Sequence, residues 1–472
     1  MFIGRKRELQ TLQELYERPG FGMMVIRGRR RIGKSTLITE FIRDKRAIFY
    51  TATKIGGDKN LELFSSQVLA VLDPDYSGAV FHSVESCFDY IGKKLGGEKL
   101  VLAIDEFPYW AEKDEALLSI LQKYIDTQWK EKELLLILCG SSLSFMEKKV
   151  LSEKSPLFGR RDGQIKLEAF NYREAGEFVP AYNTEEKAIC YGITGGVAKY
   201  LSLLDDRRTL DENIKRLFFS TNGYLYDETR NLLTQEFTDI TLVNNIIEQI
   251  ANGESAVNVI ADKVGESPSA VLYSLEKLIQ MDLVEKRHCI TEEKNRKKTG
   301  YVLKDNMFKF WYTFVPKATS VIEMGRGDLY YEKLVKPQLH AYMGNIFEEM
   351  CRCYTLEQGI LGRFGNFITR VGSWWGTEPI VSDDGGKRQQ PTDIDVVGVS
   401  DIDKSVVVGE CKFKKEKIGE DVYDNLCRRS KLISDKYHVA AQLLFSLSGY
   451  TEWFAENECE GLLMFTLEDL YQ

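Results

Sequence analysis

Apolar and polar residues follow two different patterns over the first third of the chain. Continuous apolar runs of strand length lie within residues 23–26, 46–51, 99–106, 133–142 and 164–167. Strands that are covered by helices on both faces are apolar throughout, not alternating. Between these runs, apolar residues recur at helical spacing, as they do in 37–42, 61–72 and 84–95. The pattern predicts an α/β fold in which a parallel sheet carries helices on both faces.

The pattern changes after residue 170, which predicts further domains. Small helices over 171–240 suggest a helical lid, and residues 242–303 follow the order helix, helix, turn, helix and two-stranded wing. The aromatic run at 308–314 is more typical of a buried seam than of a base-stacking surface.

A second α/β unit is predicted at the end of the chain. The pattern there gives a helix at 345–356, strand-like residues at 367–375 and apolar strands at 392–399 and 405–413. The predicted domains are therefore a P-loop core, a helical lid, a winged helix, a helical linker and a C-terminal α/β domain, at 1–170, 171–240, 241–315, 316–340 and 341–472.

Composition narrows the class of protein. A chain of 472 residues with a net charge of −8 has room for about three domains and no overall attraction for polyanions, so any nucleic-acid site must be a local patch. The nine cysteines show no Cys-x-x-Cys pair, which favours free thiols in a reducing compartment. The sequence has neither an apolar leader near its start nor an apolar run of about 20 residues. We therefore expect a cytoplasmic protein with no membrane partner.

The first strand is followed by a motif that binds phosphates. Gly28, Gly33, Lys34 and Ser35 match Gly-x-x-x-x-Gly-Lys-[Ser/Thr], and a helix pattern follows directly. Such a loop converges its N–H groups on phosphate oxygens at a helix N-terminus, while the lysine reaches the β- and γ-phosphates and the serine holds Mg²⁺. The sequence thus predicts an ATP site formed by Gly28, Arg29, Arg30, Arg31, Ile32, Gly33, Lys34, Ser35 and Thr36.

Two later strands end in residues that suit nucleotide hydrolysis. Asp105 and Glu106 close the apolar run at 99–106, and ligands of open α/β sheets lie at the carboxyl ends of strands. Asp105 is predicted to reach the Mg²⁺ shell, and Glu106 to polarise the water that attacks the γ-phosphate. The run at 133–142 ends similarly, in the small polar residues Ser141 and Ser142.

This half of the chain resembles AAA+ ATPases of the archaeal-type ATPase family. The resemblance implies that the segment around Ile3 covers the adenine, and that Ser141, or alternatively Ser142, acts as a sensor of the γ-phosphate. It also implies a nucleotide-directed arginine, for which Arg160 is the candidate; acting between subunits, it would require a homo-oligomer. The turn at 194–201 resembles the family's lid motif, with Ala198 where proline is usual.

The predicted winged helix has features both for and against DNA binding. Its last helix offers only Lys277, next to Glu276, and is a poor recognition element. The wing is richer in positive charge, with seven basic residues against three acidic ones between 285 and 304: Lys286, Arg287, Lys294, Arg296, Lys297, Lys298 and Lys304. Phosphate contact by the wing and a role as a link between the lid and the C-terminal domain both remain open.

The two strands of the C-terminal unit predict a second site. In a hairpin centred on residues 402–403, paired residue numbers sum to 805, so Asp395 faces Glu410 and Asp393 faces Lys412. Opposed residues have Cβ atoms about 5 Å apart, so two carboxylates there would repel each other without a cation between them. Mg²⁺ or Mn²⁺ held by Asp395 and Glu410 would remove the repulsion and leave Lys412 to hold or deprotonate a water. An acidic hairpin paired internally with Lys412 is the alternative.

The arrangement resembles the PD-(D/E)XK, or restriction-endonuclease-like, nucleases. There an acidic residue of the first helix joins the metal shell; Glu348 best fits that place, with Glu349 as the fallback. The resemblance implies a nuclease-like α/β domain that cleaves phosphodiesters through Glu348, Asp395, Glu410 and Lys412. The whole chain is then expected to be a Mg²⁺-dependent ATPase that positions this domain on DNA. The alternative is a nucleotide-switched scaffold whose C-terminal domain only binds a partner.

Overall fold

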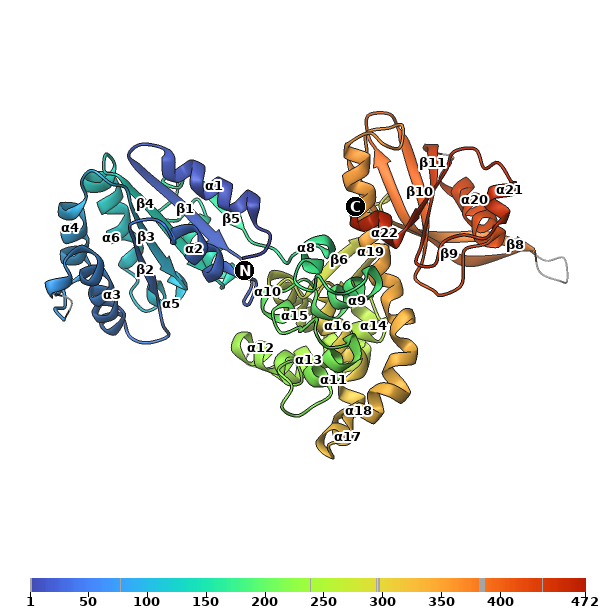
Figure 1. The fold of residues 1–472 in the computed structure, drawn as a ribbon, viewed down its shortest axis with the longest axis horizontal. Helices are drawn as coiled ribbons and strands as arrows, with labels where there is room; N and C mark the ends of the chain where they lie inside the picture. Colours follow the sequence, from blue (N-terminus) through green and yellow to red (C-terminus); the bar gives the residue numbers. More distant parts are fainter. Residues whose placement is uncertain are drawn as a thin grey trace. The chain divides into compact units, whose positions relative to one another are not determined.

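The protein was analysed as a computed structural model (Figure 1). It describes residues 2–76, 78–237, 239–293, 295, 298–381, 387–434 and 436–472. The chain forms two compact units: the first comprises residues 1–170 and 197–199, and the second comprises 171–196 and 200–472. Lys294, Arg296 and Lys297 of the predicted wing lie outside the described residues, as do residues 382–386.

The first unit is built on a parallel sheet in the order β2-β3-β4-β1-β5. β1 lies beside β4, which in turn lies beside β3, so the carboxyl ends of these three strands are neighbours. The strands are β1 Phe21–Arg27, β2 Ala47–Thr51, β3 Leu100–Asp105, β4 Leu134–Gly140 and β5 Gly163–Lys166. The α-helices are α1 Lys6–Glu17, α2 Lys34–Ile42, α3 Gly57–Leu72, α4 Val84–Lys94, α5 Phe107–Ala111, α6 Leu117–Tyr124 and α7 Leu143–Phe145. The other helical turns are η1 Pro74–Tyr76, η2 Ile125–Trp129 and η3 Met146–Leu151.

Both faces of this sheet are buried, which explains the continuous apolar runs. Successive strand residues such as Met23 and Met24 enter opposite cores. α3, α4 and α6 cover one face, and α1 and α2 cover the other (Figure 1). The predicted parallel sheet between two helical layers is confirmed.

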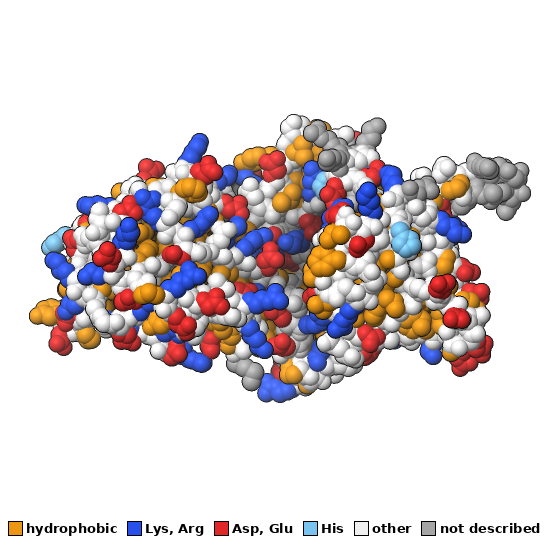
Figure 2. Space-filling view, turned by 90° about the horizontal axis from the view of Figure 1, so that it is seen from above, with side chains coloured by type: hydrophobic (Ala, Val, Ile, Leu, Met, Phe, Trp, Pro, Cys, Tyr) orange, Lys and Arg blue, Asp and Glu red, His pale blue; other side chains and the backbone are white. Residues whose placement is uncertain are grey.

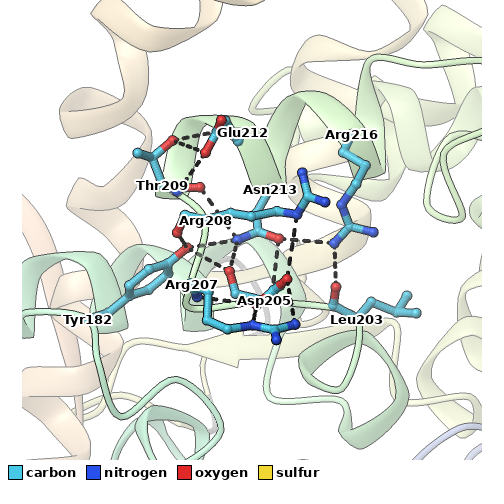
Figure 3. A network of polar contacts seen from close by, with 9 residues as sticks. All are labelled: Tyr182, Leu203, Asp205, Arg207, Arg208, Thr209, Glu212, Asn213 and Arg216. Carbon is cyan, nitrogen blue, oxygen red and sulfur yellow. Dashed lines mark hydrogen bonds and ion pairs between the residues drawn. The ribbon is translucent and has the colours of Figure 1, made fainter.

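The second unit begins with short helices whose loops are fixed by buried polar groups. They are α8 Tyr172–Gly176, α9 Thr184–Thr194, α11 Leu210–Phe218 and α12 Glu228–Glu236, while α10 Ala198–Leu201 begins in the first unit and ends in the second. Asn213 of α11 is fully buried and donates to the Tyr182 hydroxyl (2.7 Å) and the Asp205 carbonyl (2.7 Å) (Figure 3). Its Oδ1 accepts from the N–H of Asp205 (3.1 Å) and from Arg216 (3.0 Å). One amide thus holds the loop between α10 and α11.

Replacing Asn213 with alanine is expected to lower the free energy of unfolding of the second unit by about 2–3 kcal/mol, because several buried partners would lose their hydrogen bonds. Urea unfolding followed by circular dichroism would measure the change. Arg207→Ala is the matched control because the Arg207 side chain is 87% exposed, and this variant should keep the urea midpoint of the unaltered protein. Equal urea midpoints for Asn213→Ala and the unaltered protein would show that Asn213 does not stabilise this loop.

Three helices and a two-stranded hairpin follow: α13 Ile240–Ala251, α14 Val257–Val264, α15 Pro268–Gln280, β6 Val284–His288 and β7 Thr299–Leu303. β6 and β7 are antiparallel. The aromatic run forms α16, Asn306–Phe314, in which Phe308, Phe310, Tyr312 and Phe314 are buried. The prediction that this run is a seam and not an exposed stacking surface is confirmed. Further short helical segments lead onward: η5 Pro316–Ala318, α17 Thr319–Glu323, α18 Gly327–Tyr330, η6 Tyr331–Val335 and η7 Lys336–Gln338.

The chain ends in a mixed sheet of order β12-β11-β10-β9-β8. α20 packs on the face that carries Val406 and Val408, and Phe347 and Cys351 of α19 pack beside Phe413 and Cys411. The elements are α19 Leu339–Ile360, β8 Arg370–Val381, β9 Lys387–Ser400, β10 Ser405–Lys412, α20 Glu420–Ser434, β11 His438–Ser446, α21 Trp453–Glu456, β12 Leu462–Thr466 and α22 Leu467–Tyr471. α19 begins at Leu339 and runs through Gly344, so it is longer than the predicted helix at 345–356.

The hairpin register agrees with the prediction. β9 and β10 are antiparallel, and their pairs, from Ser400–Ser405 to Val396–Gly409, sum to 805. The described pairs stop one position before Asp395 and Glu410. On the other side of β9 the register to β8 shifts between the pairs Val397–Gly372 and Ile394–Trp374. Asp395 and Val396 therefore lie opposite the single residue Ser373, as in a β-bulge, a feature that re-aims side chains beside functional sites.

Surface charge and cysteine chemistry agree with the composition. On the face drawn in Figure 2, lysine and arginine side chains are interspersed with aspartate and glutamate. All nine cysteines lie in the described part of the chain and are free thiols. Over that same part, no helix combines the length and apolar character needed to cross a membrane.

Candidate functional site

The phosphate loop lies between β1 and α2 and is shaped by its two glycines. Gly33 has a φ of 96°, and a Cβ on Gly28 would lie 2.5 Å from the Leu167 carbonyl oxygen, so both positions require glycine. The Lys34 side chain is buried and donates to the carbonyl oxygens of Gly28 (2.9 Å) and Arg29 (3.0 Å). The lysine thus lies inside the loop, where a phosphate group would be cradled.

The residues predicted for metal binding and hydrolysis meet at the carboxyl ends of three strands. The Ser35 hydroxyl donates to the buried carboxylate of Asp105 (2.5 Å), so the two predicted Mg²⁺ contacts lie together. Glu106 accepts from both the N–H (3.2 Å) and the hydroxyl (2.7 Å) of Ser141. Glu106 has a φ of 48°, a left-handed conformation that is uncommon for glutamate and typical of functional turns. Ser141, not Ser142, is therefore the residue that holds Glu106.

Arg5 was not among the predicted site residues, yet it ties the N-terminal segment to the loop. Its guanidinium donates to the carbonyl oxygens of Glu168 (2.5 Å) and Ile32 (3.4 Å) and lies 4.0 Å above the Phe170 ring. The segment that contains Ile3 is consequently anchored beside the phosphate loop. The sequence could have indicated Arg5, because it lies in the same N-terminal segment as Ile3.

Other predicted residues of this unit have mainly structural contacts. Arg160 makes a two-pronged ion pair with Asp126 (2.8 and 2.7 Å), which raises the pKa of its guanidinium. It also donates to two carbonyl oxygens of its own turn. Arg30 donates to the Tyr109 hydroxyl (2.5 Å). Ala198 belongs to the first unit: its Cβ lies 3.4 Å from the position that a Cβ on Gly33 would take.

The second predicted site gathers acidic residues from three elements. Glu348 comes from α19, Asp395 from the irregular stretch of β9 and Glu410 from β10. Glu348 and Asp395 line one cavity, and Asp395 accepts a hydrogen bond from the N–H of Cys411 (2.9 Å), the residue after Glu410. Glu349, the fallback, is ion-paired with Arg287. The structure therefore brings together Glu348, Asp395 and Glu410.

Burial and mutual repulsion govern the electrostatics of these carboxylates. Burial, together with the charges of Glu410 and Glu348, raises the pKa of Asp395 to about 8. Burial also raises the pKa of Glu348, and Arg352 only partly opposes this. Three carboxylates are therefore gathered in one buried site. The negative charges of Asp395 and Glu348 are not fully compensated by nearby cations.

Two cations compensate Glu410. The Lys412 ammonium donates to its carboxylate (2.6 Å), and although burial opposes charging, this contact raises the pKa of Lys412. Arg429 of α20 also donates to Glu410 (3.2 Å) and to the Asp393 carbonyl (3.3 Å). Sequence reasoning missed Arg429, because it lies 19 positions after Glu410 and on a separate element.

No set of three histidine, cysteine, aspartate or glutamate side chains among the described residues is arranged as a ready metal site. The donor chemistry nevertheless suits Mg²⁺, which is commonly bound by one or two carboxylates together with water and substrate phosphates. Asp395 and Glu410 are the residues that would hold such an ion.

Two cavities adjoin these residues. The first, of about 450 Å³, is lined by Glu348 and Asp395, by two residues just before α14 and by residues of β6 and β7. The second, of about 510 Å³, is lined by basic and acidic side chains: Lys412, Lys414, Lys417, Arg429, Glu410, Glu416 and Asp421. The first cavity is therefore acidic and aromatic, and the second is mixed in charge.

The described basic residues of the hairpin are largely engaged within the protein. Arg287 pairs with Glu285 and Glu349, Lys298 pairs with Glu292, and Lys304 pairs with Asp282. Lys298 also donates to the Trp375 carbonyl of β8 (3.2 Å). These contacts favour the linking role over a free phosphate-binding wing.

Comparison with known proteins identifies two regions of the chain. A family described as an ATPase domain predominantly from Archaea matches residues 2–204, and a family of archaeal and bacterial proteins of unknown function matches residues 311–422. The uncharacterized protein MJECL04 of Methanocaldococcus jannaschii is 30% identical over 99% of this chain and 100% of its own length. The uncharacterized ATP-binding protein MJ0423 of the same organism is 37% identical over 10% of this chain and 78% of its own length.

A solved structure supports the fold. The Walker-type ATPase paby2304 of Pyrococcus abyssi matches with a TM-score of 0.50 and 19% identity, over 66% of this chain and 96% of that chain. The first unit therefore has the α/β architecture of a P-loop ATPase. The match to the ATPase family supports ATP hydrolysis by this unit.

Proposed function

We propose, given that this chain belongs to the same family as MJECL04 and carries the archaeal-type ATPase domain, that its ATP turnover controls phosphodiester cleavage at the second site. The observation that carries the proposal is the convergence of Glu348, Asp395 and Glu410 beside Lys412 within a chain that also holds a complete phosphate loop. The substrate is then DNA or another nucleic acid.

At the first site each residue has a separate task. Lys34 would contact the phosphates in place of the loop carbonyls, and Ser35 with Asp105 would hold Mg²⁺, which supplies positive charge at the phosphates. Glu106 polarises the attacking water while Ser141 fixes its carboxylate. Arg160 stays a candidate for nucleotide contact only if its pair with Asp126 opens.

Lys34→Ala is expected to abolish detectable ATP hydrolysis, because the buried ammonium is the charge that meets the β- and γ-phosphates. The second unit should keep its thermal transition, since the two units have separate cores. Phosphate release and calorimetry on the same sample would measure both. Lys45 cannot serve as a control because its side chain is only 10% exposed and contacts Tyr16 and Phe41. Lys132→Ala offers an exposed lysine away from the loop. Unfolding of the second unit in the same variant that loses ATP hydrolysis would contradict the separation of the chain into two independently folded units.

At the second site, Asp395 and Glu410 would hold Mg²⁺ or Mn²⁺, which supplies charge neutralisation at the scissile phosphate. Lys412 orients a water or the phosphate through its ammonium, and Glu348 completes the acidic shell. A nucleotide-switched scaffold is the second candidate, because Glu410 is already paired with both Lys412 and Arg429, as an inert hairpin would be.

ATP hydrolysis rates with single-stranded DNA, duplex DNA and RNA test the coupling. Stimulation by a nucleic acid that the protein also cleaves with Mg²⁺ or Mn²⁺ supports the proposal. Absence of both stimulation and cleavage, with ATP hydrolysis intact, favours the scaffold.

A further inference from the structure

The β6–β7 hairpin forms a fixed wall beside the acidic site. The N–H of Ile290 donates to the Ser373 carbonyl of β8 (3.1 Å), and Arg370 of β8 donates to the Ile290 carbonyl (3.1 Å). The Ile290 side chain packs against Gly372, where there is no side chain to prevent the contact. A Cβ on Gly372 would lie only 2.9 Å from the Ile290 side chain. Ile290 also enters the same apolar core as Trp374. The wall is therefore part of the folded unit and not a free arm.

The hairpin contributes residues of β6 and β7 to the lining of the first cavity, which Glu348 and Asp395 also line. Ser255, Ala256 and Gly300 line it from the α14 and hairpin side, and Trp375 and Asp393 line it from β8 and β9. Trp375 pairs with Asp393 across the two strands, so their side chains share a face of the sheet. A tryptophan and the carboxylates thus border one space.

The size of this space discriminates between nucleic-acid structures. A cavity of 450 Å³ corresponds to a sphere about 10 Å across, which suits one small-molecule-sized group. Even the major groove of a duplex is about 12 Å wide, so a whole duplex cannot enter. An unpaired nucleotide can enter and stack on an indole, because every base has a π-face.

The second cavity adjoins the same carboxylates. Glu410 lines it, and Asp395, which lines the first cavity, accepts from the N–H of Cys411, the residue after Glu410. Lys414, Lys417 and Arg429 can contact backbone phosphates there whatever the base sequence, although acidic side chains of the same cavity offset part of their charge.

Resting on the proposed nuclease function, we propose that the second site takes an unpaired polynucleotide strand, with one base stacked on Trp375 in the cavity walled by the β6–β7 hairpin. DNA and RNA share this chemistry. Duplex is accepted only where it presents an unpaired end or bubble.

The test is binding without cleavage. Fluorescence anisotropy of the full chain in EDTA is measured with a 30-nucleotide single strand of DNA, the same sequence as RNA, and a blunt duplex. We expect the single strand to bind at least about tenfold tighter than the duplex. Trp375→Ala should weaken single-strand binding about tenfold, and Trp375→Phe should restore most of it, because stacking is retained.

Ala256→Trp provides a variant that leaves Trp375 untouched. Ala256 is exposed and lines the cavity, so an indole there fills the space without disturbing the core. Single-strand binding should fall while the thermal transition stays in place. Trp453→Ala, a half-buried tryptophan of α21 that packs on Tyr423 and Phe454, is the matched control and should bind normally.

The outcomes separate this inference from the proposed function. Duplex binding equal to or tighter than single-strand binding, or single-strand binding unchanged in Ala256→Trp, overturns the inference even if cleavage is observed. No binding of any nucleic acid overturns the proposed function as well. A preference for DNA or for RNA would show which of the two polymers is the substrate, and the requirement for an unpaired strand would stand.

Discussion

Replacing Glu106 with glutamine is expected to lower the rate of ATP turnover by about 10²–10⁴-fold while ATP binding changes little. Glutamine keeps the size of the side chain, and its carbonyl oxygen can still accept from the N–H and the hydroxyl of Ser141, which hold Glu106. What is lost is the negative charge that polarises the attacking water. Lys34, Ser35 and Asp105 remain in place, so the nucleotide stays bound.

The measurement pairs steady-state phosphate release with binding of a fluorescent ATP analogue. Glu112→Gln, an exposed glutamate at the end of the next helix, is the control and should hydrolyse ATP at the normal rate. Turnover within threefold of normal in Glu106→Gln would exclude Glu106 as the residue that activates water. Loss of ATP binding in this variant would instead assign Glu106 to the nucleotide pocket.

The sequence was informative wherever chemistry and local pattern coincide. A strand buried on both faces must be apolar, so the end of each run marked the edge where Asp105, Glu106 and Ser141 now meet. The hairpin register could be predicted from the centre of the turn alone, because pairing in an antiparallel ladder is fixed by its turn.

Contacts between distant elements could not be predicted. Arg429 meets Glu410 only because α20 packs across β10, and no local pattern indicates that crossing. Arg160 was a candidate through the family resemblance, but its partner, Asp126, lies 34 residues earlier. Basic residues of the wing looked like a phosphate-binding surface, yet Arg287 and Lys298 meet acidic partners supplied by folding. Charge counts do not reveal pairing.

Lys412→Ala is expected to reduce nucleic-acid cleavage with Mg²⁺ or Mn²⁺ by about 10²-fold or more, because its ammonium is the positive group next to Glu410 that can orient water or phosphate. Folding should survive, since Arg429 still compensates the carboxylate of Glu410. ATP hydrolysis without nucleic acid should be unchanged, because the ATP site belongs to the other unit. Conversion of supercoiled plasmid and of labelled single strands would be followed over time.

Lys415→Ala provides the matched control for this result. Lys415 is exposed three positions later and is not among the described residues that line either cavity, so its removal changes local charge without touching the site. Asp395→Asn adds a second variant, which keeps the shape of the side chain but removes a predicted metal-binding charge. Cleavage at the normal rate in both Lys412→Ala and Asp395→Asn would mean that the acidic cluster is structural. Lack of cleavage by the unaltered protein with either metal would leave Glu410, Lys412 and Arg429 as an internally paired core, and the C-terminal domain would then act by binding a partner.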